Sequence, residues 1–322
     1  MDMPIELRNA VDDAALSFKQ SQLKDAVKIL SARYETESGQ GKRLVSRDVE
    51  TAAYAVVRMP ATFGAVSSAL EYAVNICGEE FKDMLDVGAG TGTATFAALA
   101  VLESDIKITC IEREDSMIKL GKKLAANDST FSKAKWIQKD FTRSSIDEKA
   151  DLVIASYSLN ELDDNNRKRI LEELWRATGK MLLIVEPGTP VGFGQIRAAG
   201  EILVKAGGYI AAPCPGNEAC PITEGDWCHF TARVSRSKLH KLLKEADVPY
   251  EDEKYSFLAV MKKEVQPAAM RVLRHPVKEP GKITLSLCTK DGIMNAVVTK
   301  KDGKLFKEAR KASAGDDFEF PE

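Results

Sequence analysis

A glycine-rich turn between an apolar run and a helical pattern constrains this sequence more than any other feature. Residues 84–92 read Met-Leu-Asp-Val-Gly-Ala-Gly-Thr-Gly, so a short apolar run ends near Asp86 and three glycines follow at alternate positions. Glycine has no Cβ, so the backbone can approach a ligand closely, and the free N–H groups of the following helix face an anionic group. The sequence therefore predicts a buried parallel strand, a ligand-binding turn formed by Gly88, Gly90 and Gly92, and a helix.

An acidic residue supports a nucleoside site at this turn. Glu112 ends the next apolar run, twenty residues after Gly92, where a carboxylate can accept hydrogen bonds from ribose hydroxyls. The spacing Asp-x-Gly-x-Gly-x-Gly differs from the Gly-x-Gly-x-x-Gly of pyrophosphate-binding turns. It resembles the first motif of class I S-adenosylmethionine (SAM)-dependent methyltransferases. The alternative is a glycine-rich turn that binds no ligand.

Strand and helix patterns alternate from about residue 81 to residue 263, which predicts an α/β fold with a parallel sheet covered on both faces. Ligands of such sheets bind at the carboxyl ends of the strands. Asp140 and Ser156 lie at two of these ends and join the candidate SAM-binding residues; Asp140 could bond the adenine amino group or cap its own loop. The expected strands are 82–86, 107–112, 135–138, 151–156, 181–186 and 255–261. A helix is expected between the fourth and fifth of them, with Asp163 or Asp164 as its N-terminal cap and Gly179 at its end.

The segment after the fourth expected strand shows no recognisable acceptor motif. Residues 156–162 read Ser-Tyr-Ser-Leu-Asn-Glu-Leu. Methyltransferases that act on base amines often carry Asn/Asp-Pro-Pro-Tyr here, and those that act on pyrimidine carbon need a cysteine nucleophile. Methyl transfer can proceed by in-line positioning alone. The sequence therefore leaves catalysis open and names no catalytic residue.

The first 78 residues follow helical spacing, with a loop expected over 38–41, a helix break at Pro60 and a helix end capped by Gly78. No chemistry is evident in this region, and Tyr54 and Arg58 are interpreted as packing and surface residues. The N-terminus lacks a secretory pattern, and no apolar run is long enough to span a membrane, so we expect a cytoplasmic protein with no membrane partner.

Three of the six cysteines fall in one loop rich in proline and glycine: Cys214, Cys220 and Cys228. In a cytoplasmic protein, thiols gathered in this way point to a metal site more than to disulfides. Cys288 or His229 could supply a fourth ligand. The gaps are longer than those usual for structural zinc, whereas the two Cys-Pro pairs are similar to those of iron–sulfur proteins. The spacing leaves an iron–sulfur cluster, zinc and unligated cysteines open.

The C-terminal part of the chain is basic, although the net charge of the whole is −2. Residues 262–312 have a local balance of +8, and a second basic cluster occupies residues 233–244. An extended connector over 267–280, two strands joined by a hairpin at Asp291-Gly292 and a basic helix over 304–312 are expected. Basic charge on a small β element indicates contact with a phosphate backbone, and a solvated charged surface is the alternative. His240 and His275 are expected at the surface.

Several runs together resemble one family, the Rsm-twenty-two-type methyltransferase-like proteins of the small ribosomal subunit. The likeness covers nearly the whole chain, and the cysteine region is its most specific part. Two positions depart from the pattern: Gly216 stands where relatives commonly have histidine, and Gly200 stands where a longer side chain is expected. The matching runs are Tyr54 with 58–62, then 85–92, 156–162, 186–190, the two Cys-Pro pairs, 227–234, 251–255 and 311–312.

The resemblance implies a class I SAM-dependent methyltransferase (Rossmann-like) fold. The expected divisions are a helical N-terminal region (1–80), a SAM-binding domain (81–265) with a Cys-rich metal-binding insertion (208–232), and a β-rich C-terminal element (266–322).

The family also implies ligands and partners. The likeness implies that Cys214, Cys220, Cys228 and Cys288 hold a [4Fe–4S] cluster. It implies a factor that binds SAM and rRNA during maturation of the small ribosomal subunit, and a monomer is expected off the ribosome. The alternatives are a catalytically active rRNA methyltransferase and a zinc-containing small-molecule methyltransferase.

Overall fold

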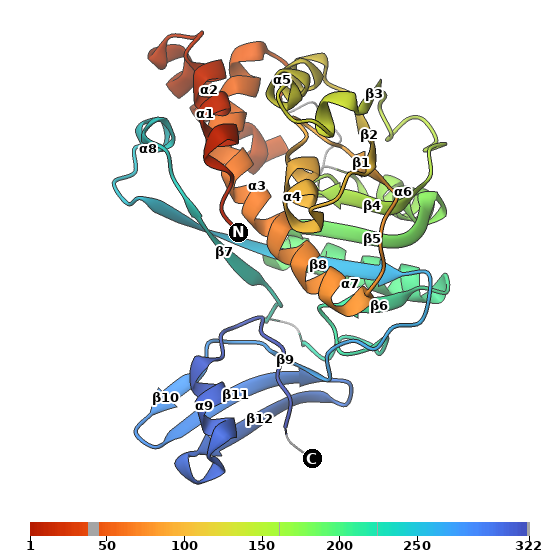
Figure 1. The fold of residues 1–322 in the computed structure, drawn as a ribbon, viewed down its shortest axis with the longest axis vertical. Coiled ribbons are helices and arrows are strands. Elements are labelled where there is room, and N and C mark those ends of the chain that lie inside the picture. The colour runs from red at the N-terminus through yellow and green to blue at the C-terminus, as the bar shows by residue number, and fades with distance from the viewer. Residues whose placement is uncertain (38–44, 161, 224, 321–322) are drawn as a thin grey trace.

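The computed structural model describes residues 1–37, 45–160, 162–223 and 225–320, and a mostly parallel sheet forms its centre (Figure 1). The strand order is β3-β2-β1-β4-β5-β8-β6, and β7 pairs with β8. The first five strands in this order run parallel, whereas β8 is antiparallel to β5 and to β6. The strands are β1 (Asp83–Val87), β2 (Lys107–Glu112), β3 (Lys135–Gln138), β4 (Ala150–Ser156), β5 (Thr178–Pro187), β6 (Tyr209–Ala212), β7 (Phe230–Ser235) and β8 (Tyr250–Met261).

This strand order confirms the α/β class. The order β3-β2-β1-β4-β5 is that of a doubly wound nucleotide-binding sheet, in which the ligand crevice lies where the strand order reverses, beside β1. The antiparallel β8 between β5 and β6 is the strand arrangement of class I methyltransferases. The glycine turn and the end of β4 therefore meet at one edge of the sheet.

Helices cover both faces of the sheet and bury two separate apolar cores. The N-terminal helices α1, α2 and α3 lie with α4 and α5 over one face, and α6 and α7 lie over the other. The helices are α1 (Ile5–Ala15), α2 (Gln20–Glu37), α3 (Asp48–Cys77), α4 (Thr93–Leu102), α5 (Asp115–Ala125), α6 (Asp164–Ala177), α7 (Pro190–Lys205), α8 (Lys238–Lys244) and α9 (Lys304–Lys311), with 3₁₀ turns η1 (Phe131–Lys133) and η2 (Lys300–Asp302).

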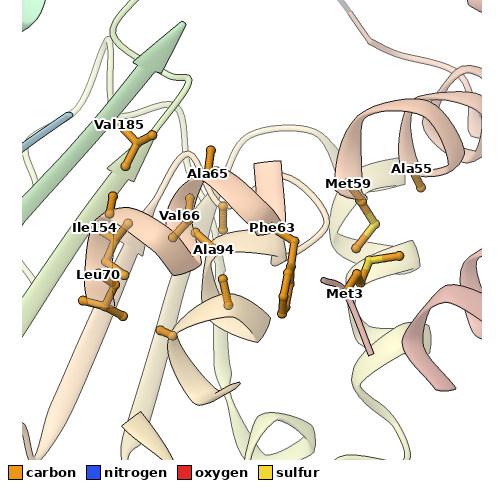
Figure 2. Close-up of a cluster of buried hydrophobic side chains, with 14 of the residues drawn as sticks. Met3, Ala55, Met59, Phe63, Ala65, Val66, Leu70, Ala94, Ile154 and Val185 are labelled. Atoms are coloured by element: carbon orange, nitrogen blue, oxygen red, sulfur yellow. The ribbon is translucent and has the colours of Figure 1, made fainter. Parts of the chain in front are cut away.

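Helix α3 runs without a break for 30 residues, so the predicted interruption at Pro60 is wrong. Almost every residue in the middle of this helix is buried. Figure 2 shows Phe63, Val66 and Leu70 of α3 in one cluster with Ile154 of β4 and Val185 of β5. Pro60 has no backbone N–H and so removes one hydrogen bond from the helix. The contacts that α3 makes on several sides compensate for this loss, because tertiary packing outweighs local helix propensity.

The boundaries of two helices test individual sequence signals. Asp163 caps α6 as predicted, because its side chain accepts a hydrogen bond from the backbone N–H of Asn166 at 2.9 Å. Gly78 ends α3 in the left-handed region, as predicted, with φ of 58°. Gly179 was expected to end α6, but α6 ends at Ala177 and the glycine lies inside β5. The expected loop over 38–41 lies outside the described residues.

Residues 270–311 form a second, antiparallel sheet with its own small core. The order is β10-β11-β12, β9 pairs with β11, and α9 packs on the sheet. The expected hairpin is present, whereas the segment 267–280, expected as an extended connector, contains two short strands. The strands are β9 (Met270–Val272), β10 (Val277–Glu279), β11 (Lys282–Thr289) and β12 (Gly292–Thr299).

His240 is fully buried, so its predicted place at the surface is wrong. Ser237 caps the short helix α8 and also bonds Asp12 of α1, which presses this helix against the N-terminal region. Glu251 lies 3.2 Å from Nε2 of His240 and forms ion pairs with Arg236 and Lys244. Much of the basic cluster at 233–244 is therefore neutralised by neighbouring carboxylates.

Candidate functional site

The glycine turn after β1 has the left-handed backbone that its sequence predicts, with φ of 74° at Gly88, 54° at Gly90 and 79° at Gly92. The glycines serve different purposes. A Cβ on Gly92 would lie 2.4 Å from the ring of Phe131, so this glycine allows close packing. A Cβ on Gly90 would meet no atom within 4 Å, because this glycine faces an open cavity.

Glu112 ties the glycine turn to the end of β2. Its carboxylate accepts hydrogen bonds from the backbone N–H groups of Gly90 at 2.7 Å and of Arg113 and Glu114 at 2.8 Å each. Burial raises the pKa of Glu112 although these three bonds favour the ionised form. Glu112, the residue predicted to bind ribose, thus also fixes the conformation of the glycine turn.

A cavity of about 100 Å³ lies at the carboxyl ends of β1, β2 and β4. Four predicted SAM-binding residues line it: Gly88, Gly90, Glu112 and Ser156. Among the described residues, Asp86, Gly92 and Asp140 do not.

The side chains of Asp86 and Asp140 have local partners instead. Asp86 is buried behind the turn and accepts a hydrogen bond from the Thr95 hydroxyl at 2.8 Å. Asp140 caps its own loop by accepting from the backbone N–H of Thr142 at 3.0 Å, the second of the two interpretations of this residue.

The burial of Asp86 predicts that the stability of the protein depends on pH. Burial raises its pKa from 3.8 to about 7, so the folded state takes up a proton that the unfolded state releases. Stability is therefore lost as pH rises from about 4 through 7, and Asp86→Asn, which cannot ionise, escapes this loss. We expect the free energy of unfolding of this variant, relative to the parent, to rise by about 2 kcal/mol between pH 5 and pH 8. Urea unfolding at both pH values measures this, and parallel curves for the two proteins would contradict it.

The N-terminal helices contribute a wall of this cavity that the sequence interpretation missed. Tyr34 of α2 and Tyr54 and Thr62 of α3 line it, and the rings of the two tyrosines stack with centroids 6.4 Å apart. The interpretation of Tyr54 as a packing residue is therefore incomplete. The family resemblance includes Tyr54, and this was the available signal, because helical periodicity cannot distinguish a cavity wall from a core.

Tyr157 stands directly after β4 with φ of 54°, a strained conformation for a residue with a large side chain. Its hydroxyl donates to Oε1 of Glu253 at 2.9 Å, and Nη2 of Arg58 donates to the same oxygen at 3.2 Å. Burial and Glu253 raise the pKa of Tyr157 well above its ordinary value, so this phenol stays protonated and is unsuited to act as a base. Arg58 is thus half of an ion pair that joins α3 to β8, a specific role beyond the expected surface one.

The loop after Tyr157 is shaped by Glu186, a fully buried carboxylate at the end of β5. It accepts hydrogen bonds from the backbone N–H groups of Leu159 at 2.9 Å and Asn160 at 3.3 Å. Glu161, part of the same sequence run, lies outside the described residues. Glu186 thus fixes the backbone of this loop, and the described residues of the loop include no cysteine nucleophile.

A second cavity, of about 380 Å³, lies between α7, the loop joining β6 to β7, and the second sheet. All four predicted metal ligands line it: Cys214, Cys220, Cys228 and Cys288. Of the two candidates for the fourth ligand, Cys288 lines the cavity, whereas the ring of His229 stacks on Trp227 with centroids 5.5 Å apart.

Cys288 is buried, and the other three cysteines of the second cavity are half-buried. Burial and the neighbouring thiols raise the pKa of Cys228 to about 12 and that of Cys288 to about 11. In the part of the chain that the structure describes, no three His, Cys, Asp or Glu side chains are arranged so that they could hold a single metal ion. The geometry thus brings the four cysteines to one cavity without forming a single-ion site.

None of the described helices is long and apolar enough to cross a membrane.

Comparison with solved structures gives limited similarity. Magnesium protoporphyrin IX methyltransferase from Synechocystis PCC 6803, with bound SAH, is 12% identical with a TM-score of 0.41, covering 63% of this chain and 84% of that one. The N-methyltransferase NodS from Bradyrhizobium japonicum is also 12% identical, with a TM-score of 0.42, covering 64% of this chain and 98% of that one. Because these scores are below 0.5, the fold assignment rests on the strand order.

Sequence comparison gives the family. The human protein "Ribosome assembly protein METTL17, mitochondrial" is 28% identical over 284 residues, which is 82% of this chain. The match spans 61% of the length of that relative. The family described as "Mitochondrial small ribosomal subunit Rsm22" matches residues 48–319. Since this match includes both sheets and all four cysteines of the second cavity, the chain belongs to the Rsm22 family.

Proposed function

We propose that this protein assists assembly of the small ribosomal subunit, binding SAM in the first cavity, an iron–sulfur cluster in the second and rRNA through the C-terminal sheet. Membership of the Rsm22 family and the similarity to a human ribosome assembly protein support the assembly role. The observation that carries the proposal furthest is the gathering of four cysteines, from segments 60 residues apart in the chain, around one cavity.

The side chains around the first cavity fit SAM. The backbone at Gly90 leaves room for a ligand, and Glu112 stands at the end of β2, where a ribose would lie. The hydroxyl of Ser158 lines the cavity and, among the described residues, is buried with no hydrogen-bond partner, which suits a polar ligand. The cavity volume of about 100 Å³ is below the range of roughly 300–1,000 Å³ typical of ligand pockets, so we expect wall side chains to move when SAM binds.

The donor set of the second cavity fits a cluster better than a single zinc ion. Tetrahedral zinc needs four sulfurs each about 2.3 Å from one point, and no such group is present among the described residues. A [4Fe–4S] cluster gives each of four thiolates its own iron and so joins sulfurs that lie farther apart. When bound, the cluster would join the β6–β7 loop to the second sheet.

The cluster is tested on protein purified without oxygen. We expect about four irons and four sulfides per chain and a broad visible absorbance at about 400 nm. A colourless protein with one zinc per chain would instead support the zinc-containing methyltransferase. Protein with neither metal, and with four thiols that react freely, would reject both.

Exposed basic side chains support contact between the C-terminal sheet and RNA. The residues that carry them are Lys278, Lys290, Lys300, Lys301, Lys307 and Arg310. No aromatic platform accompanies them among the described residues, so the contact would be to the phosphate backbone rather than to bases. In the 233–244 cluster, by contrast, Arg233, Arg236 and Lys244 pair with Asp252 and Glu251.

Charge reversal in the second sheet is expected to weaken RNA binding. Lys300→Glu with Lys301→Glu should reduce affinity for small-subunit rRNA by at least about tenfold at low salt and flatten the dependence of affinity on salt concentration. The matched control, Lys238→Glu with Lys241→Glu on α8, makes the same charge change in the other cluster. Equal losses in both double variants would contradict a specific role of the C-terminal sheet.

Catalysis is a second candidate function, favoured by the intact glycine turn and Glu112. Calorimetry with SAM, followed by transfer of a labelled methyl group to immature small-subunit rRNA, separates the two. Binding without transfer supports an assembly factor, which is our proposal because no base can be named among the described residues after β4. The cytoplasmic location remains a prediction, and the human relative is named as a mitochondrial protein.

A further inference from the structure

One buried cation links the two segments that carry the cysteines. Arg271 of β9 is 2% exposed. Its Nε donates to the carbonyl oxygen of Pro213 at 3.0 Å, and its Nη1 donates to the carbonyl oxygen of Gly315 at 2.9 Å. It also forms an ion pair with Asp317. The planar guanidinium can reach in several directions at once, which a lysine cannot do.

Both contacts of Arg271 with the cysteine segments are direct. Pro213 immediately precedes Cys214, so the Nε bond fixes the backbone where the ligand loop leaves β6. In the antiparallel pairing of β9 with β11, Arg271 stands opposite Cys288. One residue therefore sets the position of the loop relative to the strand that supplies the fourth cysteine.

The same guanidinium is also anchored to the main domain. Its Cζ lies 5.0 Å from the centre of the Tyr72 ring of α3, within the range of a cation–π interaction. Tyr72 stacks in turn on Phe257 of β8. The second sheet is thus joined to the first through the residue that touches both cysteine segments.

Arg271 also places a buried positive charge beside the cysteines, because it lines the second cavity together with all four of them. A [4Fe–4S] cluster with four thiolates carries a net negative charge, which is costly to bury without a nearby cation. Asp317 offsets Arg271 only in part, because its side chain is 46% exposed and screened by water.

We propose that Arg271 is the positioning residue of the cysteine site: it holds the ligand loop against β11 and compensates the charge of the bound cluster. The second part of this inference, charge compensation, depends on the cluster of the proposed function. The first half, assembly of the site by Arg271, concerns the protein chain alone.

The test compares Arg271→Gln, Arg271→Lys and a control, Arg236→Gln. Arg236 is also a largely buried arginine, with a side chain 12% exposed, but it pairs with Glu251 and does not line the second cavity. We expect Arg271→Gln to retain less than half of the iron and sulfide of the parent, with a more negative reduction potential for what remains, because the added electron loses a nearby cation. Arg271→Lys keeps the charge but not both hydrogen bonds, so its potential should stay near that of the parent while its iron content falls. Arg236→Gln should resemble the parent.

A second measurement does not need the cluster. In chelator-treated protein, limited proteolysis should cleave the 213–229 segment at least tenfold faster in Arg271→Gln than in the parent. The inference would be overturned if the parent contains iron and Arg271→Gln has the same iron content, reduction potential and cleavage rate as the parent. If the parent contains no iron, the proposal of a cluster is rejected. The proteolysis experiment would then test only whether Arg271 positions the cysteine loop. If Arg271→Gln does not fold, Arg271→Lys with full iron content would overturn the inference.

Discussion

Replacement of Cys288 by serine is expected to abolish the iron–sulfur cluster and to loosen the C-terminal sheet in the same step. Cys288 is the sole proposed ligand from the second sheet, whereas the other three cysteines share the β6–β7 loop. Loss of one of four thiolates leaves an iron without its protein ligand, and the free energy of metal binding is also free energy of folding. Loss of a few kcal/mol corresponds to a fall in Tm on the order of 10 °C for a protein of this size.

The matched control for this prediction is Cys77→Ser. Cys77 ends α3 and is partly exposed, so the variant removes one thiol without touching the second cavity. Iron and sulfide content, visible absorbance and thermal unfolding measured on both variants give the result. Full cluster content in Cys288→Ser would rule out this residue as a ligand, and equal loss in Cys77→Ser would show a general effect of thiol removal.

Substitution of Gly90 by alanine is expected to reduce SAM affinity by at least tenfold, about 1.4 kcal/mol. A Cβ at this position meets no protein atom within 4 Å and would project into the first cavity. The variant should therefore fold, although alanine at a φ of 54° costs about 1–2 kcal/mol. Calorimetric titration with SAM measures the affinity, and chemical unfolding measures the stability.

Gly78→Ala provides a control with nearly the same backbone strain. Gly78 has φ of 58°, and a Cβ there also meets nothing within 4 Å, but it caps α3 and does not line the first cavity. Both variants should lose similar stability, and only Gly90→Ala should lose affinity for SAM. Unchanged affinity in Gly90→Ala would place the ligand elsewhere.

Local chemistry explains which elements could be predicted. The turn after β1 requires glycines because its backbone is left-handed, and Asp163 caps α6 because a carboxylate satisfies a free N–H group. The hairpin between β11 and β12 was also predictable from Asp291-Gly292, although its turn falls one residue earlier, at Lys290 and Asp291, and Gly292 begins β12. Each of these signals acts over a few residues, so the sequence contains it whole.

Features that depend on distant partners could not be predicted in this way. Pro60 remains helical because the rest of the protein packs around α3, and His240 is buried because α8 packs against α2 and α3. The strained backbone of Tyr157 depends on Glu253, which lies 96 residues later. At the candidate SAM site, the glycines and Glu112 were predictable from spacing, but the tyrosine wall was not, because its helices belong to another part of the chain.

The burial of α3 has a consequence for the order of events during synthesis. This helix packs on β7 and β8, whose residues are made more than 150 positions after its own. At a synthesis rate of about 5–20 residues per second, the apolar side of α3 stays exposed for roughly ten seconds or more before β7 and β8 leave the ribosome. The newly made N-terminal helices therefore need temporary cover, from each other or from a chaperone, until the last strands of the first sheet arrive.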